Sequence, residues 1–143
     1  YSNFPTAITA GPDGNLWFAE FERDIGRVTP RGVVTEFPLP RSRIAALDGV
    51  PQDITAGPDG NLWFTEIYGN GVGRITRAGH VTVFPLPTGN SGPTGITTGP
   101  DGNLWVTGTC SNRIERITPA GQVTEYKVAR STHWTGQYCI PPI

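Results

Sequence analysis

The side chains of this sequence that could move a proton or hold a cation are two histidines and two glutamates at repeated positions. His80 lies in a short turn, and His133 lies beside Trp134 near the end of the chain. Glu20 and Glu66 occupy the same place in two copies of a repeated segment. Imidazole is the most frequent general base, and neighbouring carboxylates supply the oxygen ligands that a divalent cation prefers. Any such chemistry depends on whether the fold brings these groups together.

The two cysteines, Cys110 and Cys139, offer a different chemistry. In an oxidising compartment they would form a disulfide that ties the C-terminal tail to the preceding repeat, and the alternative is two buried thiols. Their spacing does not match a zinc site. The sequence also lacks a Gly-x-Ser-x-Gly elbow, a phosphate-binding loop and a His-Glu-x-x-His motif. Catalytic sites of those types are therefore excluded.

Composition indicates a turn-rich β protein. Of 143 residues, 19 are glycine and 14 are proline, too many for long helices, while 36% are hydrophobic, too many for a disordered chain. The net charge of −1 argues against a nucleic-acid partner, and no apolar run is long enough for a membrane span. The chain starts at Tyr1, which we interpret as a mature form without its leader or as an excerpt of a longer chain.

A repeated segment defines the organisation of the chain. It begins at Ile8, Ile54 and Ile96, and reads Ile-Thr-Ala-Gly-Pro-Asp-Gly-Asn-Leu-Trp in the first two copies and Ile-Thr-Thr-Gly-Pro-Asp-Gly-Asn-Leu-Trp in the third. In every copy a second block containing Arg-Val-Thr or Arg-Ile-Thr and a third block containing Val-Thr follow in the same order. The copies are offset by 46 and then 42 residues, which is the length of one four-stranded β-propeller blade.

Each unit is expected to contain four short antiparallel strands. In the first unit these strands cover 6–11, 16–20, 26–29 and 33–37, and Pro-Asp-Gly-Asn and Pro-Arg-Gly form intervening turns. Two prolines follow the fourth strand, which places it at a sheet edge because proline cannot donate to the ladder. We predict an all-β fold, a partial β-propeller of three four-stranded antiparallel blades. The blades cover about 1–40, 41–87 and 88–129, and a C-terminal tail covers 130–143.

The tryptophans of the repeat, Trp17, Trp63 and Trp105, are expected to fill the space between blades. Propellers close with roughly four to eight blades, so three blades leave two apolar faces to cover. Two copies of the chain could close one ring, the commonest kind of symmetric oligomer. Alternatively, further blades complete a larger ring, or tail residues such as His133, Trp134 and Tyr138 cap an open arc.

The run Ile-Thr-Ala-Gly-Pro-Asp-Gly-Asn-Leu-Trp-Phe-Thr-Glu at 54–66 resembles the blade consensus of the virginiamycin B lyase (streptogramin lyase) family. The blocks at 73–76 and 34–40 are similar to that consensus too, so the resemblance covers 4–129. It implies a magnesium-dependent, seven-bladed lyase that opens a cyclic depsipeptide antibiotic at its ester C–O bond. Other proteins carry the same blades without this activity, so the site has to be compared residue by residue.

In active lyases, the resemblance implies an acidic residue, a proline and a catalytic histidine at the start of one blade, followed by a metal-associated glutamate. The positions that match the histidine hold Thr6, Gln52 and Thr94. The residues that match the acidic position are Phe4, Val50 and Gly92. Neither threonine nor glutamine can take a carbon-bound proton at neutral pH. The glutamate is kept as Glu20 and Glu66, and Gly108 replaces it in the third copy.

These comparisons favour a non-catalytic binding or structural module over an enzyme. We expect it to be secreted or periplasmic, and to complete its ring by self-association or with a partner chain. The alternative is a magnesium-dependent streptogramin B lyase, or a fragment of one. No cofactor is predicted for the module, whereas a lyase would bind Mg²⁺ through Glu20 and Glu66.

A ligand, if one binds, is expected at the channel mouth, where the first strands begin and the second strands end. Thr6, Gln52 and Thr94 would line this mouth, with Phe21 and Tyr68 at its rim as stacking surfaces. His80 is expected in a solvated peripheral turn. One arginine per blade is expected to form an ion pair with the glutamates: Arg27, Arg74 and Arg116.

Overall fold

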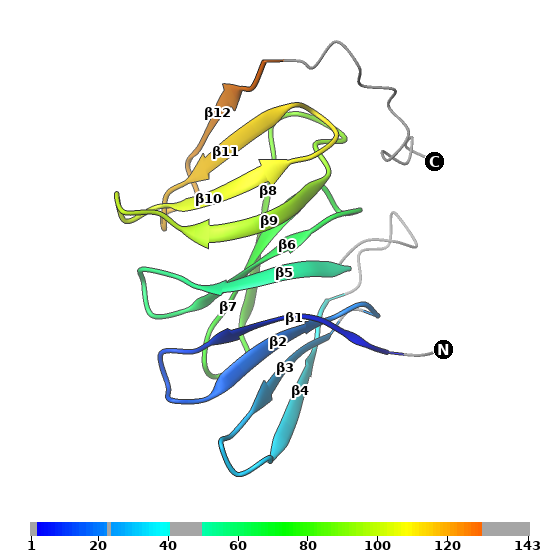
Figure 1. Cartoon of the computed structure of the whole chain (residues 1–143), viewed down its shortest axis with the longest axis vertical. Helices are drawn as coiled ribbons and strands as arrows, with labels where there is room; N and C mark the ends of the chain where they lie inside the picture. The colour runs from blue at the N-terminus through cyan, green and yellow to red at the C-terminus, as the bar shows by residue number, and fades with distance from the viewer. Residues whose placement is uncertain (1–2, 23, 41–49, 130–143) are drawn as a thin grey trace.

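In the part of the chain that the structure describes, twelve β-strands form three separate sheets, each built from four consecutive antiparallel strands (Figure 1). The computed structural model describes residues 3–22, 24–40 and 50–129. None of these residues belongs to a helix with the length and hydropathy that a membrane span requires. The predicted all-β fold with three four-stranded antiparallel sheets is confirmed. The linker 41–49 and the tail 130–143, with the end cap expected there, lie outside the described residues.

Each sheet is one blade, and the blades are numbered in chain order. Blade 1 contains β1 (Pro5–Ala10), β2 (Leu16–Glu20), β3 (Asp24–Val28) and β4 (Val34–Pro38). Blade 2 contains β5 (Pro51–Ala56), β6 (Leu62–Glu66), β7 (Gly71–Ile75) and β8 (Val81–Pro85). Blade 3 contains β9 (Pro93–Thr98), β10 (Leu104–Gly108), β11 (Arg113–Ile117) and β12 (Val123–Lys127). The inner strands β1, β5 and β9 lie side by side, and the fourth strands are sheet edges, as their prolines predict (Figure 1).

The turn between the first two strands of each blade is held by one aspartate. In blade 2, Trp63 Nε1 donates to Asp59 Oδ1 at 3.0 Å, and the backbone amide of Asn61 donates to the same oxygen at 3.2 Å. Gly60 adopts a φ of 80°, which glycine tolerates best. Burial alone would raise the pKa of Asp59, but these hydrogen bonds outweigh it and lower the pKa. The same two hydrogen bonds, which we call the aspartate clasp, recur around Asp13 and Asp101.

Tryptophans join the blades into one body. We define the trailing face of a blade as the one that bears its tryptophan, and the leading face as the one that packs against the preceding blade. Trp17 is fully buried in a cluster with blade 2 residues that include Leu62 and Phe64. Trp63 is fully buried in a cluster with blade 3 residues that include Leu104. Trp105 is only half-buried, because no further blade among the described residues covers the trailing face of blade 3.

The repeated arginines lie over aromatic rings instead of forming the expected ion pairs with the glutamates. The guanidinium carbon of Arg27 lies 5.5 Å from the ring centres of both Trp17 and Phe37. Arg27 Nη1 also donates to the carbonyl oxygen of Arg77, in the β7–β8 turn of the next blade, at 3.3 Å. Arg74 behaves in the same way: its Nη1 donates to the carbonyl oxygen of Pro119 in blade 3 at 3.1 Å. Each of these two arginines therefore forms a hydrogen bond between its own blade and the next one.

Candidate functional site

The three residues at the position of the expected histidine lie at the start of the inner strands. Thr6 Oγ1 donates to the carbonyl oxygen of Gln52 at 3.2 Å, so β1 and β5 meet here. Thr94 Oγ1 lies 2.6 Å from Thr109 Oγ1 and 3.1 Å from Thr107 Oγ1. These hydroxyls are hydrogen-bonded to the scaffold, and no imidazole or carboxylate stands at these three positions to act as a base.

Glu20 lies in an acidic cluster that sequence reasoning did not find. The carboxylates of Glu20, Asp24 and Glu36 lie within 4.8 Å of one another, at the ends of β2 and β3 and in β4. Burial raises the pKa of Glu20, the charges of Glu36 and Asp24 raise it further, and a hydrogen bond from the Asn3 amide opposes them. Glu20 lies opposite Asp24 on the neighbouring strand, and Glu36 lies on a third strand. The spacing of residues along the chain does not reveal a group that three strands bring together. Its chemistry suits a divalent cation bound by oxygen ligands.

The other predicted site residues lie in separate surroundings. Glu66 is buried at the end of β6, opposite Gly71. The ring of Phe21 stacks on the ring of Phe4 with 5.0 Å between centres, so one of its faces is already covered. Tyr68 is half-buried in the loop between β6 and β7, and His80 is exposed in a peripheral turn, as expected.

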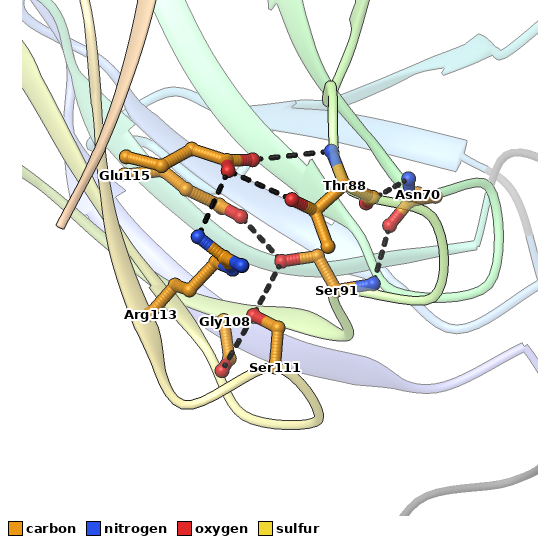
Figure 2. Close-up of polar contacts among 8 residues, drawn as sticks. Asn70, Thr88, Ser91, Gly108, Ser111, Arg113 and Glu115 are labelled. Carbon is orange, nitrogen blue, oxygen red and sulfur yellow. Dashed lines mark hydrogen bonds and ion pairs between the residues drawn. The ribbon is translucent and has the colours of Figure 1, made fainter. Parts of the chain in front are cut away.

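The third blade has a buried carboxyl where the other blades have none. Glu115, in the middle of β11, is completely inaccessible to solvent. Ser91 Oγ donates a hydrogen bond to Glu115 Oε1, and Ser111 Oγ lies 3.0 Å from Ser91 Oγ (Figure 2). Glu115 Oε2 and Arg113 Nε have no hydrogen-bond partner within the described residues. Burial raises the pKa of Glu115, and among the smaller influences Ser91 lowers it and Glu125 raises it.

A paired exchange of residues explains this buried carboxyl. In blades 1 and 2 the position of Glu115 is a glycine, because the ring of Phe18 or Phe64 occupies the space beside it. A Cβ atom on Gly73 would lie 2.1 Å from the ring of Phe64. In blade 3 the phenylalanine is replaced by Val106, which leaves room for the longer side chain. In an alignment of the three repeats, the phenylalanine and the glycine are both replaced in the third copy. This paired change is the sequence signal that could have revealed the buried carboxyl.

The network continues into the linker between blades 2 and 3. Glu125 accepts hydrogen bonds from the amide of Thr88 at 3.1 Å and from Thr88 Oγ1 at 2.7 Å, and it forms an ion pair with Arg113 Nη1 at 3.2 Å. Asn70 Nδ2 donates to the carbonyl oxygen of Thr88 at 2.9 Å, and the amide of Ser91 donates to Asn70 Oδ1 at 2.7 Å (Figure 2). These contacts link Asn70 of blade 2 to the charged pair of blade 3.

Of the two cysteines predicted to form a disulfide, only Cys110 lies in the described part of the chain. Cys110, in the loop after β10, is disulfide-bonded. Cys139, its predicted partner, lies outside the described residues.

Similarity to known proteins extends over most of the chain. The family model described as the virginiamycin B lyase family matches residues 1–135. A search among curated proteins finds no match. Virginiamycin B lyase from Staphylococcus aureus is 44% identical with a TM-score of 0.82, over 88% of this chain and 42% of that chain. A catalytically inactive variant of that lyase with quinupristin gives the same identity and TM-score, over 89% of this chain and 42% of that one.

The chain is also similar to a second lyase structure and, more distantly, to an extracellular domain. A streptogramin B lyase is 40% identical with a TM-score of 0.82, over 88% of this chain and 41% of that chain. The extracellular domain of a protein from Bacteroides thetaiotaomicron is 19% identical with a TM-score of 0.67, over 90% of this chain and 18% of that chain, which is a likeness of fold alone. The chain therefore spans less than half the length of the lyases that it matches.

Proposed function

This chain belongs to the virginiamycin B lyase family, and from that premise we propose that it is a non-catalytic propeller module whose open faces bind the blades that complete a ring. The observation that carries the proposal is the absence of a base at the three positions that match the family histidine. Thr6 donates to a backbone carbonyl and Thr94 contacts two neighbouring hydroxyls. A hydroxyl without an activating base cannot remove a carbon-bound proton at neutral pH.

A second candidate function, a magnesium-dependent lyase, draws support from the acidic cluster. Glu20, Asp24 and Glu36 form a set of oxygen ligands that fits Mg²⁺ or a similar cation. Burial raises the pKa of Glu20 most and the charges of Glu36 and Asp24 raise it further, and a bound cation would offset the repulsion among the three carboxylates. When bound, the cation would stabilise negative charge that develops on a carbonyl group during elimination. The catalytic base would then have to come from blades outside this chain.

We also propose an extracytoplasmic location. The support is the disulfide bond of Cys110, since disulfides persist in oxidising compartments and are rare in the cytosol.

Incubation with quinupristin and Mg²⁺ tests the choice between module and enzyme. Elimination breaks the ester C–O bond without consuming water, so the linear product has the mass of the substrate and is followed by chromatographic retention and fragmentation. We expect the antibiotic to remain cyclic, while the Staphylococcus aureus lyase, as a positive control, opens it. Ring opening by this chain that is lost in Glu20→Gln and kept in the matched variant Glu115→Gln would overturn the proposal and establish the lyase.

A further inference from the structure

One register position of blade 3 carries two positive charges that the other blades lack. Arg113 on β11 lies directly opposite Lys127 on β12. The equivalent pairs in the other blades are Asp24 with Pro38 and Gly71 with Pro85. Like charges directly opposite each other on neighbouring strands destabilise a sheet. The blade fold therefore forms without this cationic pair, and the pair itself requires a negative charge nearby to offset the repulsion.

Glu125 offsets only one of these two charges. Its Oε2 forms the ion pair with Arg113 Nη1 at 3.2 Å, and both of its oxygens accept hydrogen bonds from Thr88. Lys127 is exposed and forms no ion pair with a described residue. Glu115 is completely inaccessible to solvent, and burial raises its pKa, which disfavours its charged form. One positive charge of the pair is therefore left without a partner.

The two cations line a pocket of about 360 Å³ at the end of blade 3. Its described lining, which contains no carboxylate, consists of Ser111, Asn112, Arg113, Lys127 and Val128. The side-chain amide of Asn112 has no hydrogen bond to the described residues, whereas the equivalent Asn70 donates to the carbonyl oxygen of Thr88. Pockets that hold small molecules span roughly 300–1,000 Å³. This one thus has the size for a small molecule and the donors for a negatively charged one.

The guanidinium of Arg113 has an edge without an acceptor. Its Nη1 is paired with Glu125, but its Nε is buried and has no hydrogen-bond partner within the described residues. A buried donor without an acceptor costs free energy. The edge of a guanidinium that carries Nε fits two oxygens of a carboxylate or phosphate, and such bidentate pairs are strong. An oxyanion at this edge would supply the missing acceptor.

Both cations lie on the leading face of blade 3. Side chains alternate between the two faces of a strand, so Arg113 shares its face with Ile117, and Lys127 shares its face with Val123. Ile117 and Val123 pack in the cluster that contains Trp63 of blade 2. A further blade on the trailing face would therefore pack on the opposite side of the sheet from both cations.

We propose that this pocket binds a small organic oxyanion, a molecule with one carboxylate or phosphate group. The oxyanion lies between Arg113 and Lys127, and it accepts a hydrogen bond from the side-chain amide of Asn112. Its charge offsets the repulsion between the two cations. The site goes beyond the proposed function, because it needs neither a catalytic base nor a completed ring.

Isothermal titration calorimetry of the full chain with phenyl phosphate and with benzoate tests the site. The two probes share a ring and differ in the charged group, and benzyl alcohol is the neutral control. Ionic strength is held constant, because salt screens exposed charges. We expect saturable one-to-one binding of at least one anion and none of the alcohol. Tighter binding of phenyl phosphate identifies a phosphate as the ligand group, and tighter binding of benzoate identifies a carboxylate. Absence of saturable binding by both anions would overturn the inference.

Lys127→Gln tests whether the binding occurs at this pocket. The side chain is exposed, and blades 1 and 2 fold with proline at the same position, so this variant keeps the fold. Loss of one charged hydrogen-bond donor should raise the dissociation constant about tenfold or more. Arg31→Gln is the matched control, because it removes one exposed positive charge from a turn of blade 1 and should leave the affinity unchanged. An unchanged affinity in Lys127→Gln, or an equal loss in Arg31→Gln, would refute the site.

Two further measurements locate the bound anion. Arg113→Lys keeps the charge and removes the planar fork, so it should also weaken binding. In amide NMR spectra of the unmodified chain, the anion should shift the signals of Asn112, Arg113 and Lys127. Shifts confined to blades 1 and 2 would place the anion elsewhere and contradict the inference.

Discussion

The two junctions between blades share one backbone design and differ in their chemistry. Between blades 1 and 2, the ring of Phe64 lies over Gly73 in a fully apolar contact. Between blades 2 and 3, Val106 and Glu115 occupy the same two positions, and the space holds a hydrogen-bonded carboxyl. Strand register is the same in both. The difference shows that a propeller junction accepts either a ring or a polar network, provided that both positions change together.

The largest effect is expected from removing the ring of the first junction. Phe64→Ala deletes a fully buried side chain and leaves a cavity, which should lower the free energy of unfolding by about 3–5 kcal/mol. Val106→Ala, its counterpart, removes fewer carbons and should cost about 2 kcal/mol. Urea denaturation followed by tryptophan fluorescence measures both. Equal losses would show that the two junctions do not differ in packing as described.

A smaller effect is expected when the glycine beside that ring gains a methyl group. Gly73→Ala places a Cβ atom 2.1 Å from the ring of Phe64, and the resulting overpacking should cost about 1–3 kcal/mol. The double variant Phe64→Val with Gly73→Ala introduces the valine that blade 3 has at this position and so makes room for the new methyl group. Its loss should be less than the sum of the two single losses. Additive losses in the same denaturation assay would refute the steric explanation.

The pH dependence of stability separates the second junction from the first. The pKa of Glu115 is raised above its ordinary value of 4.5, chiefly by burial. Its folded form thus holds a proton more tightly than its unfolded form, so its contribution is complete below 4.5 and is lost as pH rises through the folded pKa. Denaturation at several values between about pH 4 and about pH 8 should show this loss.

Glu115→Gln should flatten that pH profile, since an amide can still accept the hydrogen bond from Ser91 but does not titrate. Glu20→Gln is the matched control, because the pKa of Glu20 is also raised. This change should remove only the part of the pH dependence that Glu20 contributes and leave the part that Glu115 contributes. A profile unchanged by Glu115→Gln would mean that Glu115 stays ionised in the folded protein.

The smallest effect concerns the aspartate clasps on either side of the second junction. Asp59→Asn weakens the hydrogen bond from Trp63 Nε1 and the contact with Arg74 Nη1 at 3.8 Å, and should cost about 1 kcal/mol. Asp101→Asn alters the same clasp around the half-buried Trp105 and should cost less. Because the pKa values of both aspartates are lowered, this stabilisation is present above their ordinary value of 3.8 and is lost as pH falls below it. Equal costs in urea melts would contradict the ranking.

Sequence reasoning located the strands well because their signals are local. The Pro-Asp-Gly-Asn turns and the alternating apolar residues predicted β1 and β2 within one residue, and the clasp of Asp13 with Trp17 explains why that turn recurs. The site was harder to predict. Sequence spacing paired Glu20 with Glu66, whereas the fold groups Glu20 with Asp24 and Glu36 across three strands.

The arginines show the same limit. Their repetition indicated a structural role correctly, but the expected partners were the glutamates, and the structure has Arg27 and Arg74 over aromatic rings and bonded to the next blade. A contact to a different repeat leaves no trace in the spacing within one repeat.

By itself, the sequence determined the blade: its four strands, its turns, and which residues share a face, because these follow from backbone preferences and the two-residue period of a strand. Only the tertiary structure decided which of three equivalent residues is buried. Ile8, Ile54 and Ile96 are the same amino acid in the same strand position, yet their exposure differs from 62% to 4%. The physical reason is that burial depends on the blade packed opposite, and that neighbour comes from elsewhere in the chain or from another molecule.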